Sequence, residues 1–176
     1  MEKKLNILSS FFENPNKRFG IRELSRILKI NHTSVRQYLL VLEKEGFIEL
    51  VYEGNFSFYK LIVSRKMLNL KLYYNLEKIR ESGLIEDLEK FYDFPVIILF
   101  GSYVSARDDI LSDLDLCLIS NVEKVFSFEK YEKIIRRKVE LHKFTKSSWS
   151  KAKKLNPHLV NSICNGLVLS GELEVL

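Results

Sequence analysis

Residues 99–116 read LFGSYVSARDDILSDLDL, and this stretch decides how the second half of the chain is expected to fold. An apolar run ends in Gly101 and Ser102, a largely polar segment follows, and the chain then re-enters an apolar strand that carries Asp113 and Asp115. Because alternate residues of a strand point to the same face, we expect the two carboxylates to project together from one edge of a sheet. Two adjacent carboxylates repel each other unless a cation lies between them. The stretch therefore predicts a cation site, and the alternative is a solvated strand edge or a pair of turn caps.

The residues around the two carboxylates favour a bound polyphosphate. Mg²⁺ takes hard oxygen ligands, commonly one or two carboxylates together with phosphate oxygens of a substrate. Gly101 lets the backbone approach a ligand closely, and the hydroxyl and N–H of Ser102 can donate to phosphate oxygens from a helix start. Arg107 can reach a phosphate from the same loop, whereas Asp108 and Asp109 would repel one if they pointed inward.

A third carboxylate is expected from Glu140, in the strand-like residues 138–145. If that strand neighbours the one with Asp113 and Asp115, the three acids complete a clamp for two metal ions of the kind used in phosphoryl transfer. Glu140 can then help to deprotonate the attacking hydroxyl. The alternative for Glu140 is an exposed acid on an amphipathic strand. His142 shares its face, and is interpreted as a structural or surface residue more readily than as a ligand.

This pattern resembles the minimal nucleotidyltransferases of the DNA polymerase β superfamily over about residues 90–172. The resemblance rests on Gly101, Ser102, Ser112, Asp113, Asp115 and Leu116, and extends to residues 161–171 as a closing helix. It implies transfer of a nucleoside monophosphate from a nucleoside triphosphate to a hydroxyl of a protein or small molecule, with Mg²⁺ or Mn²⁺. The expected triphosphate is ATP. It also implies a partner protein, such as a HEPN-type toxin, as an acceptor.

The resemblance assigns roles to individual residues. Those expected to be catalytic and to bind metal are Asp113, Asp115 and Glu140. Those expected to bind nucleotide are Gly101, Ser102, Ser112 and Arg107. The chain departs from the family in two places: residues 105–107 read Ser-Ala-Arg where many members have a glycine, and the third acid is Glu instead of Asp.

The first third of the chain has a different pattern. Apolar spacing predicts helices over residues 2–13, 21–28 and 33–45, ended by Gly46, and then strands over 47–52 and 56–63 joined by a turn at 53–55. The order of elements, and the run Leu-Glu-Lys-Glu-Gly-Phe-Ile at 42–48, resemble the winged helix-turn-helix modules of bacterial and archaeal regulators over residues 2–65.

Charge supports a DNA-binding role for this part. Residues 1–66 hold 12 Lys and Arg against 7 Asp and Glu, whereas the rest of the chain is balanced. Such a basic segment is expected to meet a polyanion. The residues expected to contact DNA are Thr33, Ser34, Arg36, Gln37 and Lys60, with Lys17, Arg18 and Arg22 as further phosphate contacts. The alternative is a module that binds protein.

We therefore expect a two-domain protein of the α+β or α/β class: a winged helix at 1–65, connecting helices at 66–92 with a break near Ser82 and Gly83, and a nucleotidyltransferase domain at 93–176 with a small mixed sheet flanked by helices. The tail is expected to form helices at 146–155 and 157–169. Residues 67–79 are a possible homodimer interface. No apolar run approaches the roughly 20 residues of a membrane span, and two cysteines in apolar contexts favour a cytoplasmic protein. The alternative function is a DNA-binding regulator whose second domain is inactive or senses nucleotide.

Overall fold

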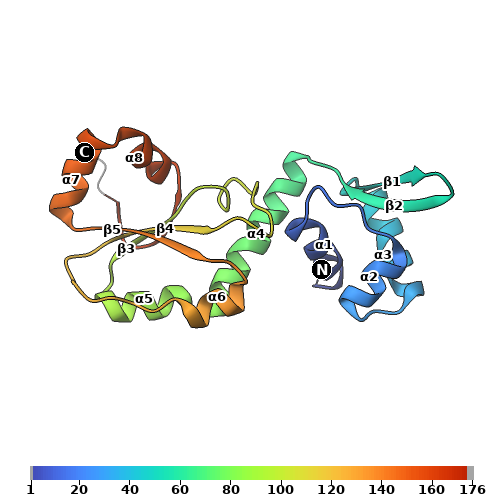
Figure 1. Ribbon diagram of the computed structural model, residues 1–176, viewed down its shortest axis with the longest axis horizontal. Coiled ribbons are helices and arrows are strands. Elements are labelled where there is room, and N and C mark those ends of the chain that lie inside the picture. The colour runs from blue at the N-terminus through green and yellow to red at the C-terminus, as the bar shows by residue number, and fades with distance from the viewer. Residues whose placement is uncertain (1, 174–176) are drawn as a thin grey trace. The chain divides into compact units, whose positions relative to one another are not determined.

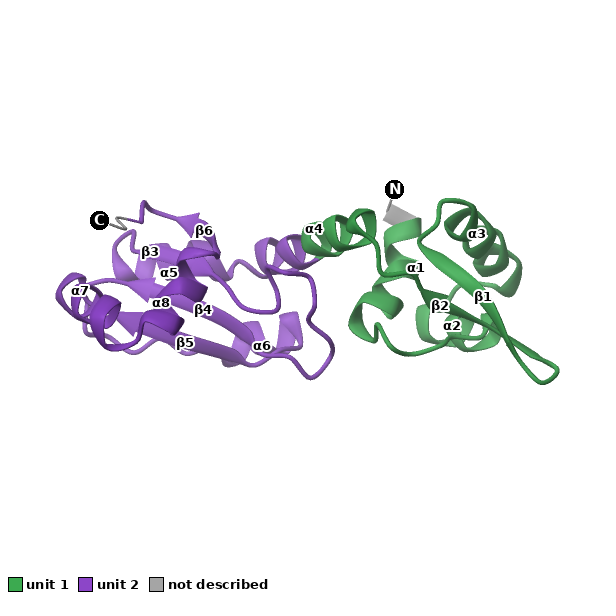
Figure 2. Cartoon of the chain, turned by 90° about the horizontal axis from the view of Figure 1, so that it is seen from above, with its two compact units in different colours: residues 1–74 green, residues 75–176 purple. Residues whose placement is uncertain are grey.

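The computed structural model describes residues 2–173 and divides the chain into two compact units, residues 1–74 and 75–176 (Figure 2). The described residues form eight helices and two small sheets, so the chain is of the mixed α+β class. Each unit has buried apolar clusters of its own. Within the described part of the chain, no helix has both the length and the apolar content needed to cross a bilayer.

Three helices and a β-hairpin form the first unit (Figure 1). In chain order they are α1 Glu2–Glu13, α2 Ile21–Leu28, α3 His32–Lys44, β1 Ile48–Glu53 and β2 Phe56–Leu61. The strands pair antiparallel, with Ile48 opposite Leu61. Asn31 caps α3 by accepting a hydrogen bond from the N–H of Ser34 at 2.8 Å, and Gly46 follows the helix with a φ of +74°. The sequence predicted this glycine as the helix stop, because a left-handed backbone is cheap only for glycine.

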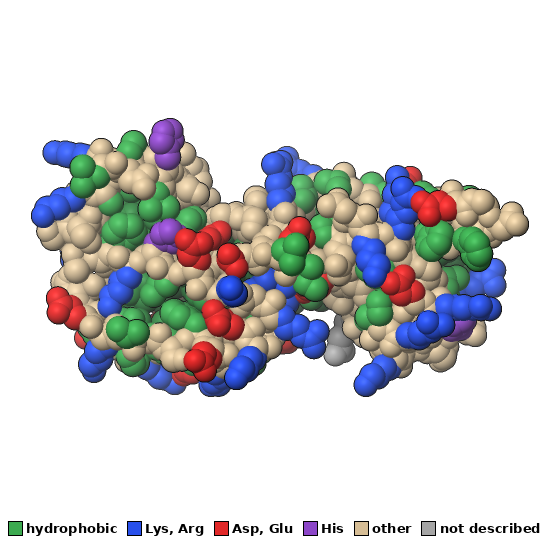
Figure 3. Space-filling model, viewed as in Figure 1, with side chains coloured by type: hydrophobic (Ala, Val, Ile, Leu, Met, Phe, Trp, Pro, Cys, Tyr) green, Lys and Arg blue, Asp and Glu red, His purple; other side chains and the backbone are tan. Residues whose placement is uncertain are grey.

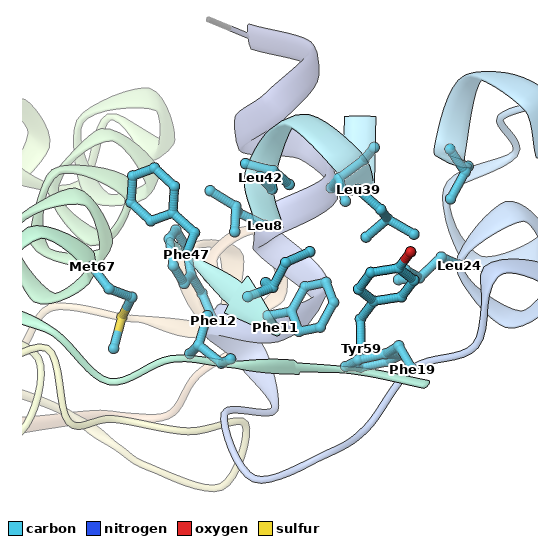
Figure 4. Close-up of a cluster of buried hydrophobic side chains, with 14 residues drawn as sticks. Leu8, Phe11, Phe12, Phe19, Leu24, Leu39, Leu42, Phe47, Tyr59 and Met67 are labelled. Carbon is cyan, nitrogen blue, oxygen red and sulfur yellow. The ribbon is translucent and has the colours of Figure 1, made fainter. Parts of the chain in front are cut away.

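The core of the first unit gathers apolar side chains from all three helices and from the hairpin (Figure 4). Phe11 and Phe12 of α1 and Leu39 and Leu42 of α3 are fully buried. The ring of Phe11 meets that of Phe19 edge-on, with centroids 5.0 Å apart. Burying a Leu or Phe side chain contributes about 1.5–3 kcal/mol, so these contacts are sufficient to fix α3 against the hairpin.

The boundary between the units falls inside the helix α4, Arg65–Ser82. Gly83 then adopts a φ of +71°, and α5 runs from Leu84 to Tyr92. The helix pair and its break were both predicted from residues 66–92. The second helix, however, buries Leu84, Leu88 and Tyr92 in the core of the second unit, so it is part of that unit's fold.

The second unit has a four-stranded mixed sheet with helices on both faces (Figure 1). Its remaining elements are β3 Val96–Leu99, β4 Leu114–Ile119, α6 Glu129–Ile135, β5 Val139–Phe144, α7 Lys146–Leu155, α8 Pro157–Cys164 and β6 Leu167–Ser170. The strand order is β5-β4-β3-β6, in which only the β4–β5 pair is parallel. Leu114, Leu116 and Leu118 pack on the side of α5 and α6. Cys117 and Ile119 pack on the side of α7 and α8.

The prediction of one helix over residues 157–169, and of a closing helix over 161–171, was wrong after Cys164. The helix stops there, and residues 167–170 form β6, which pairs antiparallel with β3. Gly166 lets the chain pass close to β3, because a Cβ at this position would lie 2.5 Å from the carbonyl oxygen of Leu99. The short apolar run Leu-Val-Leu at 167–169 suits a strand, and the free edge of β3 supplies its hydrogen-bonding partner.

Candidate functional site

Two acidic side chains lie side by side near the starts of β4 and of the edge strand β5 in the second unit's sheet. β4 and β5 pair in parallel with Asp115 opposite Glu140, so the two strands are neighbours, which was the condition for Glu140 to join the acids of β4. Both residues alternate with apolar neighbours that face α5 and α6, so both carboxylates point to the other face. Asp115 is half-buried and Glu140 is exposed. The sheet therefore holds two like charges next to each other at a surface that solvent reaches.

His142 completes a cluster of three possible metal ligands. It lies opposite Cys117, two residues along β5 from Glu140 and therefore on the same face of the sheet. One ligand atom from each of Asp115, Glu140 and His142 lies within 4.8 Å of the other two, and Nε2 of His142 is 3.3 Å from Oε1 of Glu140. Acidic side chains also gather beside a histidine on the face of this unit seen in Figure 3. The donor set of two carboxylates and one imidazole fits a divalent cation.

Gly101 lies directly against Asp115. Its φ is +74°, and a Cβ built at this position would lie only 2.1 Å from Oδ2 of Asp115. The preceding residue, Phe100, donates its N–H to the carbonyl oxygen of Asp115 at 3.1 Å. The end of β3 is thereby fixed against the start of β4, and only a glycine leaves room for the carboxylate. The sequence predicted close approach at this position, although to a ligand.

The electrostatic environment of Asp115 disfavours its negative charge. Burial is the largest cause that raises its pKa above the ordinary value, followed by the charge of Glu140, and Asp113 adds to the effect. His142 opposes it. A bound cation would relieve both the burial penalty and the repulsion.

The other predicted site residues lie around this cluster without joining it. Asp113 is exposed, one residue before β4, and is not among the three clustered ligands. The hydroxyl of Ser112 donates to Oδ1 of Asp109 at 3.2 Å and accepts from the N–H of Asp109 at 3.0 Å. These bonds hold the turn from Asp109 to Ser112 together. Ser102 lies in a series of turns over residues 101–106 and not at a helix start, and Arg107 is exposed.

The loop between β3 and β4 holds its remaining acids away from the cluster. Asp108 is buried and accepts a hydrogen bond from Nδ2 of Asn75 at 2.8 Å. The hydrogen bond that Asp109 accepts from the N–H of Leu111 is the largest of the causes that lower the pKa of Asp109. Ala106 has a φ of +54°, a left-handed conformation that costs a non-glycine residue about 1–2 kcal/mol. Many of the minimal nucleotidyltransferases that the sequence resembles have a glycine in this segment.

Two hollows border the loop. One, of about 470 Å³, is lined by Gly101 and Ser105 and by the polar side chains of α8. The other, of about 690 Å³, is lined by Ser112 and Asp113 and by basic residues that follow α6, including Arg136 and Lys138. Both have the size expected of a small-molecule site.

Only some of the residues predicted to contact DNA are exposed on one face of the first unit's helix α3. Thr33, Arg36 and Gln37 are exposed on α3, whereas Ser34 is half-buried beside its cap. Lys60 of β2 forms an ion pair with Glu49 of β1 at 2.9 Å.

Further cations of this unit are also paired. Lys17 lies 2.7 Å from Glu23, and Arg18 pairs with Glu53. Arg36 and Arg22 are exposed and make no ion pair with any residue between 2 and 173, so both charges are available to a polyanion.

Comparisons of the chain with protein-family models, with curated proteins and with solved structures found no match.

Replacing Asp115 by asparagine is expected to raise the melting temperature of the second unit at neutral pH in the presence of a chelator. The folded-state pKa of Asp115 is raised, so its ionised form destabilises the folded state above that pKa, and the penalty disappears as the pH falls toward the ordinary value of about 3.9. The advantage of Asp115→Asn should therefore shrink with acidification.

Trp149 allows this measurement to be made on the second unit alone. It is the chain's single tryptophan, lies in α7 and is 5% exposed, so its fluorescence reports unfolding of that unit. A wild-type chain that melts at or above the temperature of Asp115→Asn at neutral pH would contradict the electrostatic account.

Proposed function

We propose that the second unit is a nucleotidyltransferase of the kind found in the DNA polymerase β superfamily, and that it transfers a nucleoside monophosphate from a nucleoside triphosphate to a hydroxyl group. One observation carries the proposal: the paired carboxylates of Asp115 and Glu140, with the backbone of Gly101 against Asp115. An acidic pair facing a glycine turn can hold a divalent cation and a triphosphate at one place.

The residues of this site fit Mg²⁺ or Mn²⁺. Asp115 and Glu140 supply oxygen ligands from neighbouring strands, and the enzyme would need Asp113, which is exposed one residue before β4, to turn toward the ion when nucleotide binds. A cation held there would neutralise charge on the triphosphate and on the attacking oxygen. Backbone N–H groups at the start of the turn and the guanidinium of Arg107 would bind phosphate oxygens, because the N–H groups of Ser105 and Ala106 already donate to carbonyls of the turn.

The proposed reaction is an in-line displacement at phosphorus. The oxygen of the acceptor hydroxyl forms a bond to the α-phosphorus of the nucleoside triphosphate. The bond from that phosphorus to the oxygen bridging the α- and β-phosphates breaks, and pyrophosphate leaves with the electron pair. The hydroxyl proton passes to a carboxylate, a role that we assign to the exposed Glu140, and from there to water.

We also propose that the first unit is a winged helix-turn-helix module that binds DNA. Its three helices and hairpin follow the order expected of such a module, and α3 carries Thr33, Arg36 and Gln37 on an exposed face. Arg and Gln can donate to base edges or phosphates in the major groove. The chain can combine both activities, for instance as an enzyme that represses its own operon, alone or as a homodimer, and with a partner protein as the acceptor.

A second candidate function is a DNA-binding regulator whose second unit senses nucleotide without catalysis. The position of Asp113 outside the ligand cluster favours it, because a two-metal clamp needs that carboxylate. The two functions differ in whether nucleotide binding leads to covalent transfer.

Transfer is tested by incubating the full chain with α-³²P-labelled ATP, divalent cation and a cell lysate. The proposal predicts a labelled macromolecule or small molecule that appears with cation and not with a chelator. Cation-dependent nucleotide binding without any labelled product would favour the sensor, and absence of nucleotide binding would overturn both candidate functions of the second unit.

The DNA proposal predicts that Arg36→Ala lowers affinity for a random-sequence duplex about tenfold and reduces the salt slope of binding by about one, because one phosphate contact is lost. Gel retardation over a salt series measures both quantities. Lys90→Ala, which removes an exposed cation from α5 of the second unit, is the control and should leave both unchanged. A wild-type chain that gives no shift, or a shift insensitive to salt, would assign the first unit to protein recognition.

A further inference from the structure

We infer that His142 is a third ligand at the Asp115–Glu140 pair, and that the cluster thereby selects a first-row transition-metal ion, such as Mn²⁺, over Mg²⁺. The inference rests on the proposed function, because it takes the same face of β4 and β5 as the place where a cation meets the nucleotide. It goes further by naming the class of ion and a residue that the acidic pattern does not include.

The positions of the three side chains follow from the sheet. Glu140 and His142 are two residues apart in β5, so they share a face, and the parallel register sets them beside Asp115 and Cys117 of β4. Cys117 is fully buried, which leaves Asp115 as the polar partner on the neighbouring strand. Three donors on two adjacent strands thus face the same space without any loop being involved.

The separations match the coordination sphere of one ion. Two ligands at right angles around an ion with bonds of about 2.1 Å are about 3.0 Å apart, and two opposite ligands are about 4.2 Å apart. The Nε2 of His142 and the Oε1 of Glu140 are separated by 3.3 Å, and all three ligand atoms lie within 4.8 Å of one another. The three ligand atoms are therefore close enough for side-chain rotation to bring them onto one ion.

Packing holds the imidazole in place. The ring of His142 lies edge-to-face with Phe100, with centroids 5.3 Å apart and planes inclined by 61°. Its side chain is 26% exposed. Because Phe100 immediately precedes Gly101, the same chain segment orients the imidazole and makes room for the Asp115 carboxylate. Such preorganisation lowers the entropic cost of assembling the site.

The donor chemistry determines the choice of ion. Mg²⁺ prefers oxygen ligands and retains several waters, whereas imidazole suits transition-metal ions. Two carboxylates and a neutral imidazole also balance the charge of a divalent ion. Among these ions Mn²⁺ shares the preference of Mg²⁺ for carboxylate oxygens, so it is the transition-metal ion that compares most directly with Mg²⁺ at this cluster.

Metal titration of the full chain tests the inference. Calorimetry with MnCl₂ and with MgCl₂ should give a higher affinity for Mn²⁺, and His142→Ala should weaken Mn²⁺ binding at least tenfold, the lower end of what losing even an outer metal partner costs. Mg²⁺ binding should change less than twofold. His142→Gln, which offers an amide oxygen and keeps much of the packing, should lower the ratio of Mn²⁺ to Mg²⁺ affinity in the same way.

A spectroscopic readout separates ligation from a structural role. Electron spin-echo modulation of bound Mn²⁺ should contain the nitrogen signal of a coordinated imidazole in the wild type and in the control His32→Ala, and should lack it in both His142 variants. Trp149 fluorescence checks that the variants remain folded.

Two negative outcomes are distinguishable. Mn²⁺ affinity and nitrogen signal that are unchanged in His142→Ala, with cation binding still lost in Asp115→Asn, would overturn the inference and leave the proposed function standing. A wild-type chain that binds neither ion, with or without ATP, would overturn both.

Discussion

Asp115→Asn is expected to lower the rate of nucleotidyl transfer by about 10³-fold or more. Asp115 is the half-buried member of the acidic pair and the one in contact with the Gly101 turn, so its charge holds the cation where a triphosphate can meet it. Loss of cation-mediated charge stabilisation worth several kcal/mol corresponds to a loss of this size. Asparagine has nearly the same shape, and the variant is expected to fold at least as stably as the wild type.

The measurement is the release of pyrophosphate or the transfer of label from α-³²P-labelled ATP at saturating cation. Asp93→Asn is a matched control, because Asp93 is exposed and has a φ of +57°, a conformation that asparagine tolerates well. Transfer by Asp115→Asn within tenfold of the wild-type rate would mean that the reaction takes place elsewhere.

The second large effect is expected from Gly101→Ala. A methyl group at this position would overlap Oδ2 of Asp115, at 2.1 Å, so either the turn or the carboxylate must move. We expect divalent-cation affinity to fall at least tenfold and the second unit to lose more stability than left-handed strain alone would cause. Cation titration and urea unfolding followed by Trp149 fluorescence measure the two effects.

Gly83→Ala separates strain from the clash. Gly83 belongs to the same unit and has a φ of +71°, against +74° at Gly101, but a Cβ there would meet nothing within 4 Å. It should therefore show only the left-handed penalty of about 1–2 kcal/mol and bind cations normally. Equal behaviour of the two variants would show that the contact between Gly101 and Asp115 has no role in the site.

Local patterns in the sequence were sufficient to predict most individual elements. Gly46 and Gly83 were identified as breaks because helical periodicity stops at each of them, and both have positive φ. The residues at 53–55 predicted the hairpin turn between β1 and β2. In each case the determining interactions lie within a few residues along the chain.

Long-range pairing accounts for the elements that were predicted wrongly. β6 forms because β3 has a free edge, and nothing within residues 157–171 reports that edge. Residues 161–171 were expected to be helical by family resemblance, but Asn165 and Gly166 carried the local signal for a stop.

The candidate site was predictable in its acids but not in its full composition. Alternation in two strands was enough to expect Asp115 and Glu140 on one face, given neighbouring strands. The same alternation placed His142 there, yet a single histidine on a strand has no spacing signal that separates ligand from surface residue. Asp113 was expected to pair with Asp115, but β4 begins only at Leu114, so strand alternation does not govern its side chain.

Anomalous diffraction from crystals grown with Mn²⁺ and a non-hydrolysable ATP analogue tests the acidic site most directly. We expect a manganese peak within about 2.5 Å of oxygen atoms from both Asp115 and Glu140, with phosphate oxygens of the analogue on the same ion. A nucleotide bound with no metal at these carboxylates, or a Lys or Arg side chain filling the space between them, would contradict the account.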